Sequence, residues 1–403
     1  MKFESLKLRG AVCVLVLTAC AGLLPAQQQS GSREESIAAR QAEKAKGAVA
    51  PVPDKAEALV LKLEKMLLLE PTGFYPYFGS VYQGGGFTVG AGYRKFTGDN
   101  TALFVQGLYS FSNYKLIEGG IVSRDHFNRK LTFGSKMGWR DATQVNYFGL
   151  GIESKEANKS VYRFQQTFAD ANAELRPVKW MPIRGTVAYE NWDTKQGTGS
   201  FPSIETIFNA KTAPGLGADV KYFHSSMSAG IDWRQSPGYS RRGGLYEATL
   251  HDFNNLSGGP YSFQKLDMEA IQYLPIFRET WVLAGRARVE TTLNDNDAIP
   301  YFMMPSLGGG STLRAYDSWR FRDRHSMLMN AELRWTPSSM LDMAFFYDAG
   351  KVTSKRNDLS FQKLKSDVGV GARLHTLFAT PLRIDFAIGN EGWRIVFSGG
   401  PVF

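Results

Sequence analysis

The chain has 403 residues, of which 13% are aromatic and 41 are glycine, and its formal net charge is +9. These charges are scattered and form no basic patch, so we expect no nucleic-acid partner. Beyond the N-terminal signal region, the sequence lacks the roughly eighteen consecutive apolar residues of a membrane-spanning helix, and its mean hydropathy is −0.25. Together these two properties exclude a bundle of transmembrane helices.

Residues 1–26 are typical of an export signal. Three basic residues precede an apolar run at 11–24, which suits the hydrophobic part of a secretory signal and is short for a membrane span. Two cleavage sites compete, one after Ala26 and a lipoprotein-type site at Cys20. We favour Ala26, because a long exported barrel has little need of a lipid anchor as well. Cleavage there removes both cysteines, Cys13 and Cys20, and excludes disulfides.

Residues 27–74 predict an arm without a packed core. The polar, alanine-rich stretch 27–53 ends in prolines and indicates a flexible segment. The stretch 54–69 places leucine and methionine side chains at helical spacing and is followed by Pro71, which predicts one amphipathic helix. Two roles for this helix remain open. It either lies against the barrel or the membrane surface, which we favour, or enters the barrel as a plug.

From residue 75 onward the apolar residues recur with a period of two, which indicates β-strands. In the stretch 280–290, Leu283 and Val289 fall on one face, whereas Arg286 and Arg288 fall on the other. Several later runs alternate in the same way. Each predicted strand therefore has one oily face and one charged face.

Strand length and spacing favour a membrane barrel over a soluble sandwich. The strands have about ten residues, enough to cross an outer membrane at a tilt. Short turns such as 336–340 alternate with long loops such as 299–325. Residues 75–403, at about 20 residues per strand and connection, give roughly sixteen strands. We therefore predict an all-β fold, a transmembrane antiparallel β-barrel whose first strand is 87–96 and whose last is 393–403.

The end of the chain carries a pattern of aromatic residues. Trp393, Phe397 and Phe403 share one parity, and Phe403 is the last residue. This resembles the C-terminal signal by which outer-membrane barrels are delivered to the barrel assembly machinery. The resemblance implies location in the outer membrane, with membrane lipid and that machinery as partners during biogenesis.

Four local patterns follow one another in the second half of the chain: "DWRQSPGYSRRGG" at 232–244, "LRAY" at 313–316, Glu332 in "NAELRW", and "FYDAG" at 346–350. They are similar to a D-x-R-x-x-P turn, a V/I-R-G-F/Y loop motif, an acidic strand position and an F-x-D-x-G strand motif of the BamA/TamA family. That superfamily assembles outer-membrane proteins or secretes substrates. The resemblance covers residues 75–403.

The resemblance implies that the loop 299–325 folds back into the barrel. Arg314 would then pair with Asp348 and Glu332 on the inner wall, in charge-assisted hydrogen bonds. Gly308, Gly309 and Gly310 would allow close backbone approach, and Tyr316 and Gly350 would lie beside the ion pair. Asp232, Arg234 and Pro237 belong to the separate turn motif. Position 315 is alanine where the family usually has glycine. Two roles remain open for the ion pair, a structural latch and a working gate.

The sequence predicts a non-enzymatic function without a cofactor. The five histidines and the stretch 294–297 lack metal-site spacing. The glycine pairs lack the third glycine of a dinucleotide loop, and no G-x-S-x-G nucleophile motif is present. Relatives that handle proteins usually carry periplasmic POTRA domains, but residues 27–74 leave no room for one, so a separate periplasmic partner would have to capture clients. We expect a barrel that aids membrane-protein or lipid assembly or translocation. The alternative is a passive solute channel or structural barrel.

Overall fold

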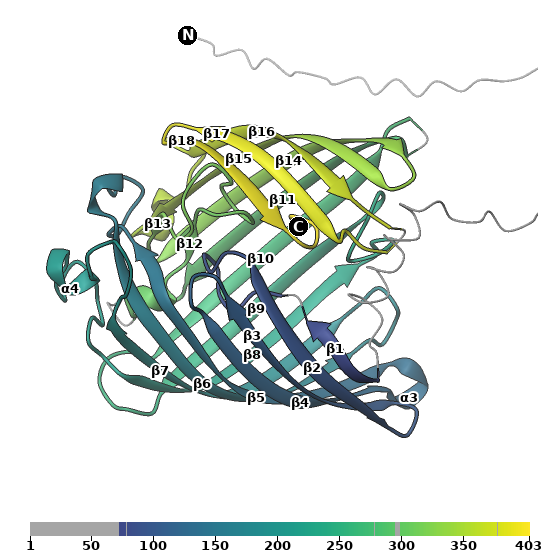
Figure 1. Ribbon diagram of the computed structural model, residues 1–403, viewed down its shortest axis with the longest axis horizontal. Helices are drawn as coiled ribbons and strands as arrows, with labels where there is room; N and C mark the ends of the chain where they lie inside the picture. The colour runs from purple at the N-terminus through teal and green to yellow at the C-terminus, as the bar shows by residue number, and fades with distance from the viewer. Residues whose placement is uncertain (1–71, 78, 278, 295–298, 377) are drawn as a thin grey trace, which may run out of the picture. The chain divides into compact units, whose positions relative to one another are not determined.

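The computed structural model describes residues 72–403, except residues 78, 278, 295–298 and 377. The signal, the arm and the amphipathic helix expected from the sequence lie outside these residues. The described part forms one antiparallel sheet of sixteen strands, which confirms the predicted fold class. Figure 1 shows this sheet curled into a barrel, with β1 and β18 at its two edges. Among the described helices, none has the length and apolar character of a membrane span.

The sheet is a meander, in which every strand pairs with its neighbours along the chain except where a loop containing the two-stranded ribbon β12–β13 is inserted. Its strands are β1 (Gly73–Tyr77), β2 (Thr88–Thr97), β3 (Thr101–Ser110), β4 (Lys115–Asp125), β5 (Leu131–Tyr147), β6 (Ser160–Leu175), β7 (Ile183–Gln196), β8 (Val220–Asp232), β9 (Gly243–Asn255), β10 (Phe263–Pro275), β11 (Trp281–Thr292), β14 (His325–Ser338), β15 (Leu341–Thr353), β16 (Lys365–Leu374), β17 (Leu382–Gly389) and β18 (Gly392–Ser398).

The remaining elements are short and lie in connections. They are β12 (Ser306–Leu307) and β13 (Phe321–Arg322), the single-turn helices α3 (His126–Arg129) and α4 (Ile204–Ile207), and the 3₁₀ turns η1 (Glu156–Asn158), η2 (Tyr301–Met303) and η3 (Arg356–Asp358). The long connections β5–β6, β7–β8 and β11–β14 leave one end of the barrel, and short turns such as β14–β15 leave the other. This asymmetry is typical of barrels with periplasmic turns and surface loops.

The two faces of the strands differ in the way that a period of two requires. On β8, Met227 is 63% exposed on the outside, whereas the adjacent Ser228 is buried inside. On β15, Phe345 and Tyr347 point outward, whereas Asp348, which follows Tyr347, is completely buried. The outer face is therefore apolar and the inner face polar, which suits a sheet with lipid outside.

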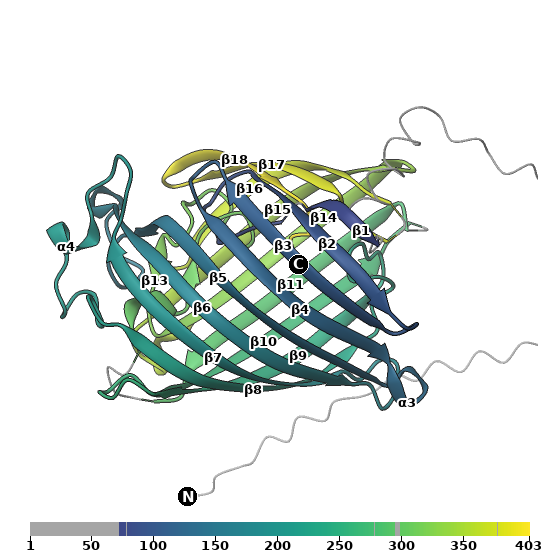
Figure 2. The same cartoon turned by 60° about the horizontal axis from the view of Figure 1, so that its bottom comes forward.

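The first and last strands do not close the sheet with hydrogen bonds. The hydrogen-bonded order runs from β1 to β18, and in the described residues no ladder joins these two strands. Strand β1 has only five residues, all paired with β2. We call the boundary between β1 and β18 the seam. Figure 2 shows these strands from a second direction.

The lumen is filled by side chains and by a long loop. Residues 299–325, here called the lumen loop, carry β12 and β13 and pack against β14, β15 and β17 around Leu307, Leu313 and Tyr316. A second cluster gathers aromatic rings from β5, β6, β7 and the lumen loop, including Tyr147, Tyr162 and Tyr301. The barrel interior is therefore packed at the surface-loop end.

Two expectations about the strands are wrong. The stretch 87–96, expected as the first strand, corresponds to β2, because β1 precedes it at residues 73–77. The last strand was expected to continue to residue 403, but β18 ends at Ser398. Pro76 lies within β1, and Gly399, Gly400 and Pro401 follow β18. Proline and glycine weaken the sequence pattern of a strand.

Candidate functional site

The centre of the candidate site is Arg314, whose side chain is completely buried inside the barrel. Its Nε and Nη2 atoms donate to the two carboxylate oxygens of Asp348, at 2.7 and 2.8 Å. Its Nη1 atom donates to Glu332 Oε1 at 2.7 Å. The structure thus brings together the three residues that sequence motifs had paired. We call this arrangement the latch.

A third carboxylate and an aromatic ring complete the surroundings of the guanidinium. Arg314 Nη1 also donates to Asp385 of β17 at 3.1 Å. The centre of the guanidinium lies 3.3 Å from the centroid of the Phe346 ring, in a cation–π contact. Planar, forked donors are suited to bidentate recognition of this kind. One arginine of the lumen loop therefore joins β14, β15 and β17.

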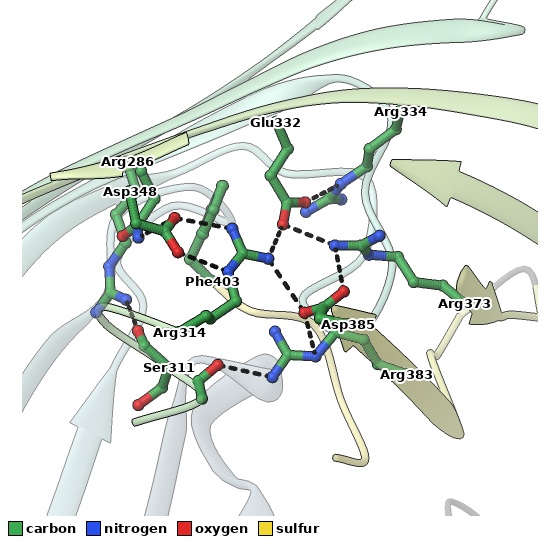
Figure 3. A network of polar contacts seen from close by, with 12 residues as sticks. Arg286, Ser311, Arg314, Glu332, Arg334, Asp348, Arg373, Arg383, Asp385 and Phe403 are labelled. Carbon is green, nitrogen blue, oxygen red and sulfur yellow. Dashed lines mark hydrogen bonds and ion pairs between the residues drawn. The ribbon is translucent and has the colours of Figure 1, made fainter. Parts of the chain in front are cut away.

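Further arginines balance the three acids (Figure 3). Arg334 and Arg373 donate to the two oxygens of Glu332, each at 2.7 Å. Arg383 Nε lies 3.5 Å from Asp385 Oδ2, and Arg383 Nη2 donates to the Gly310 carbonyl at 2.9 Å. Isolated buried charges are costly, so such acids and bases persist inside a protein only as a connected network. The network contains more residues than the sequence motifs indicated.

The glycines of the lumen loop allow close packing. Gly308 and Gly309 have φ angles of +113° and +99°, which disfavour other residues. A Cβ atom on Gly310 would lie 2.5 Å from a methyl group of Val396 in β18. Ala315 does not have a positive φ, and its N–H donates to Asp367 Oδ2 at 3.2 Å. Alanine is therefore compatible with the backbone at position 315.

Tyr316 and Gly350 lie beside the latch. Tyr316 is buried, its hydroxyl donates to the Ser366 carbonyl at 3.2 Å, and its ring packs edge-on against Phe321. A Cβ atom on Gly350 would come within 2.8 Å of Leu307, so glycine leaves space for the first residues of the lumen loop. Both positions thus help the loop to pack against β15 and β16.

The turn motif lies at the end of the barrel that carries the short turns. Arg234 makes two hydrogen bonds of 2.9 Å to the carboxylate of Asp232, and Pro237 is exposed. Later in the same turn, the Tyr239 hydroxyl donates to Asp342 Oδ2 at 2.9 Å, and its ring stacks on the His375 ring with centroids 4.1 Å apart. The β8–β9 turn therefore reaches the opposite wall, formed by β15 and the β16–β17 turn.

The C-terminal aromatic residues are in two environments. Trp393 and Phe397 face outward and are 65% and 69% exposed. Phe403 is buried inside, where its main-chain oxygen accepts from the Tyr273 hydroxyl at 2.5 Å and its ring lies 5.6 Å from the Arg334 guanidinium. Phe403 thus departs from the expected parity and does not lie at the seam, because the chain turns inward after β18.

Comparison with known proteins shows which family this barrel belongs to. A family model described as the Omp85 superfamily domain matches residues 93–403. The chain belongs to the Omp85 superfamily. This membership confirms the resemblance expected from the sequence, and the described residues contain no POTRA-like region. Among curated proteins, none matches the sequence.

Solved structures show the fold of this Omp85 chain. The crystal structure of BamA from Haemophilus ducreyi lacking POTRA domains 1–3 is 13% identical, with a TM-score of 0.60, and the match covers 81% of this chain and 69% of that one. CdiB from Escherichia coli is 11% identical, with a TM-score of 0.52, and the match covers 79% of this chain and 58% of that one. The Omp85 chain thus spans less than two thirds of CdiB.

Sequence reasoning did not identify Asp385, Arg373 and Arg383 as site residues of this Omp85 barrel. Alternation along β16 and β17 assigns all three to the lumen face. It does not give their height in the barrel, which depends on strand register and tilt. In the structure Asp385 pairs with Gly371 across the ladder, near the level of Glu332 and Phe346.

The outer end of the lumen loop contains a second buried cation. Arg322 is completely buried, and its Nη1 donates to the Tyr301 carbonyl at 2.7 Å and to the Tyr162 hydroxyl at 3.3 Å. Burial raises the pKa of the neighbouring Asp323 to about 6. Among the residues described, no group of histidines, cysteines and acids is arranged to bind a metal. The site therefore offers ion pairing and packing as its chemistry.

Proposed function

We propose that this Omp85 barrel aids membrane-protein or lipid assembly or translocation across the outer membrane, as a non-enzymatic scaffold. The observation that carries the proposal is the seam, where the described residues of β1 and β18 form no ladder. An unpaired strand edge can accept another strand by main-chain hydrogen bonds. A passive pore has no need of such an edge, since a full ladder would satisfy its backbone groups in lipid.

The latch supports the proposal by fixing the lumen loop on one side of the seam. All three acids bound by Arg314 lie on β14, β15 and β17. This wall leads directly to β18, so the loop stiffens the strands next to the seam. In this mechanism the loop holds the lumen closed while the outer wall receives a strand or a lipid.

The proposed setting is the outer membrane, which the chain reaches through its N-terminal signal. Membrane lipid surrounds the barrel, and the barrel assembly machinery inserts it during biogenesis. Because the described residues contain no POTRA-like region, we propose that a separate periplasmic partner delivers clients. In this proposal the short turns, including the inward-folded β8–β9 turn, face the periplasm.

A passive solute channel is the second candidate. Its support is the lumen wall of β10 and β11 beside the latch, where charged residues are partly exposed. Arg288 there is paired with Asp267 at 2.6 Å and is 30% exposed, in contrast to the completely buried Arg314. Charged and water-accessible walls are typical of porins. The two candidates differ in whether the lumen loop blocks the pore.

Two readouts from one set of proteoliposomes test the proposal. Single-channel conductance is compared between the wild-type protein and a variant lacking residues 306–322, and the folding rate of a second outer-membrane barrel is compared between loaded and empty vesicles. We expect small, flickering currents that become large and steady after the deletion, and faster client folding with the wild-type protein. Large, steady currents from both proteins, without faster folding, would establish the passive channel instead.

A further inference from the structure

The lumen loop contacts both sides of the seam. Its residues 308–320 reach β17 and β18 on one side and the β1–β2 connection on the other. The two edge strands share no ladder in the described chain, so these interior contacts connect them. The latch at Arg314 involves only the side of β14, β15 and β17.

On the β18 side the contacts are ionic. Asp317 of the loop pairs with Arg394 of β18, and it also accepts from Lys159 Nζ at 2.6 Å. Arg320 Nε donates to Glu391, in the tight turn between β17 and β18, at 2.8 Å. The last hairpin is therefore held from inside by a basic and an acidic residue of the same short segment.

On the β1 side the contacts are hydrogen bonds and ring stacking with the β1–β2 connection. Gln83 Nε2 donates to the Gly308 carbonyl at 2.6 Å, and the Trp319 indole donates to the Gln83 carbonyl at 2.9 Å. The Trp319 ring stacks on Tyr82, with centroids 5.0 Å apart and planes at 18°. Gln83 thus both donates to the loop and accepts from it.

The backbone of Trp319 is unusual in a way that fits this role. Its φ angle is +65°, in the left-handed region that bulky residues rarely occupy. Such a conformation persists only where the surroundings hold it, and it is concentrated at functional and switching segments. Here Tyr82 lies on one side of the indole, and the Arg322 guanidinium lies 5.1 Å from its centroid. Loss of the Gln83 and Tyr82 contacts would free this residue to relax.

We propose that Gln83, Asp317, Trp319 and Arg394 form a clasp that sets the width of the seam. The inference rests on the proposed function, because it describes how the seam is regulated. When residues 317–319 move, the seam loses contacts on both sides at once, the Asp317–Arg394 ion pair at β18 and the Trp319 contacts with Tyr82 and Gln83. Arg314 meanwhile keeps the rest of the loop in place. The clasp opens the seam for a client strand or lipid without emptying the lumen.

Distances between spin labels across the seam test the clasp directly. The labels are placed on cysteines that replace Val89 of β2 and Trp393 of β18, both of which point to lipid. The full chain carries Cys13→Ser and Cys20→Ser, so that these are its only cysteines. A second label pair at Leu250 of β9 and Met268 of β10 spans an intact ladder. The distance distributions are measured in lipid vesicles with and without clasp substitutions.

We expect Trp319→Gly, which removes the indole and relieves the positive φ, to lengthen and broaden the seam distance, and Asp317→Asn to act in the same direction. Trp335→Ala, on the lipid face, should leave the distance unchanged, as should the pair at 250 and 268 in every variant. Seam distributions identical to wild type in both clasp variants, with folding verified by heat-modifiable migration, would overturn the proposal.

A reversible lock gives an independent test. A Cβ atom at Gly84 would lie 3.4 Å from Cβ of Ser318, close to the separation that a disulfide spans. In the Gly84→Cys, Ser318→Cys protein without spin labels, oxidation should reduce client folding several-fold, and reduction should restore it. The two hypotheses can be separated. If Trp319→Gly widens the label distance but no variant accelerates client folding, the clasp stands and the proposed function is rejected. Equal client folding by oxidised and reduced protein, where wild type is active, would count against the clasp.

Discussion

At the scale of single residues, Arg314 is the cation on which the latch depends. It satisfies its donors with three carboxylates and lies on the Phe346 ring, without exposed surface. A buried ion pair contributes little net stability compared with well-packed apolar residues, but removal of one partner is costly, because the remaining charges stay buried. The latch therefore specifies where the loop lies more than it adds to overall stability.

Arg314→Ala should lower the free energy of unfolding by about 3–5 kcal/mol, since Asp348, Glu332 and Asp385 lose their shared cation. Urea unfolding in lipid vesicles, followed by tryptophan fluorescence, measures the change. The matched control is Arg288→Ala, which removes a partly exposed arginine that also forms a bidentate pair. Equal losses in the two variants would contradict a special role for burial at the latch.

At the scale of elements, the β8–β9 turn crosses the short-turn end of the barrel like a strap. Ser236 Oγ donates to the Phe378 carbonyl at 2.8 Å, and Thr380 Oγ1 donates to the Gly238 carbonyl at 3.1 Å. Together with the Tyr239 contacts, these bonds connect walls that are far apart in the meander. Hydrogen bonds inside the end of a barrel are protected from water, so a donor or acceptor left without its partner there is costly.

Tyr239→Phe should destabilise the barrel by about 1–3 kcal/mol, because Asp342 is buried and loses one hydrogen-bond donor. The ring and its stacking on His375 remain in this variant. Tyr246→Phe serves as the control, since its hydroxyl bonds to Gln272 at an exposed position. Thermal unfolding in detergent micelles compares the two, and a Tyr239→Phe protein as stable as the control would argue against the strap.

At the scale of the whole molecule, stability depends on which face of the sheet meets lipid. Residues of alternate parity on β8 illustrate the contrast, with Met227 outside and Ser226 on the inner side. A charge on the outer face near the middle of the bilayer must lose its hydration, whereas a charge on the inner face meets polar groups. The assignment of the outer face to lipid therefore makes a quantitative prediction.

Met227→Arg should destabilise the folded barrel by about 2–4 kcal/mol in lipid vesicles, because the arginine lies on the lipid face near the middle of β8. Ser226→Arg, one residue earlier on the lumen face, should cost much less. Reversible unfolding by guanidinium chloride in the same vesicles compares the two variants. If Ser226→Arg destabilises the barrel more than Met227→Arg does, the assignment of the outer face to lipid is wrong.

Much of this architecture is predictable from the sequence because a period of two is strong in lipid-facing strands. It assigned Arg286, Asp348 and Glu332 to the lumen, and the length of 75–403 gave the number of strands. It missed β1, because five residues containing Pro76 carry too weak a pattern. It placed Asp385 on the correct face without bringing it to Arg314, since convergence across strands depends on register, tilt and the path of the lumen loop.

The order of the latch residues along the chain has a consequence for folding kinetics. Arg314 precedes all its acidic partners, which lie on β14, β15 and β17. The loop can bind them only after these strands have aligned, so we expect the latch to form after the rate-limiting step of folding. Interactions absent from the transition state slow unfolding and leave the folding rate nearly unchanged. We therefore expect the buried arginine to slow unfolding of the finished barrel.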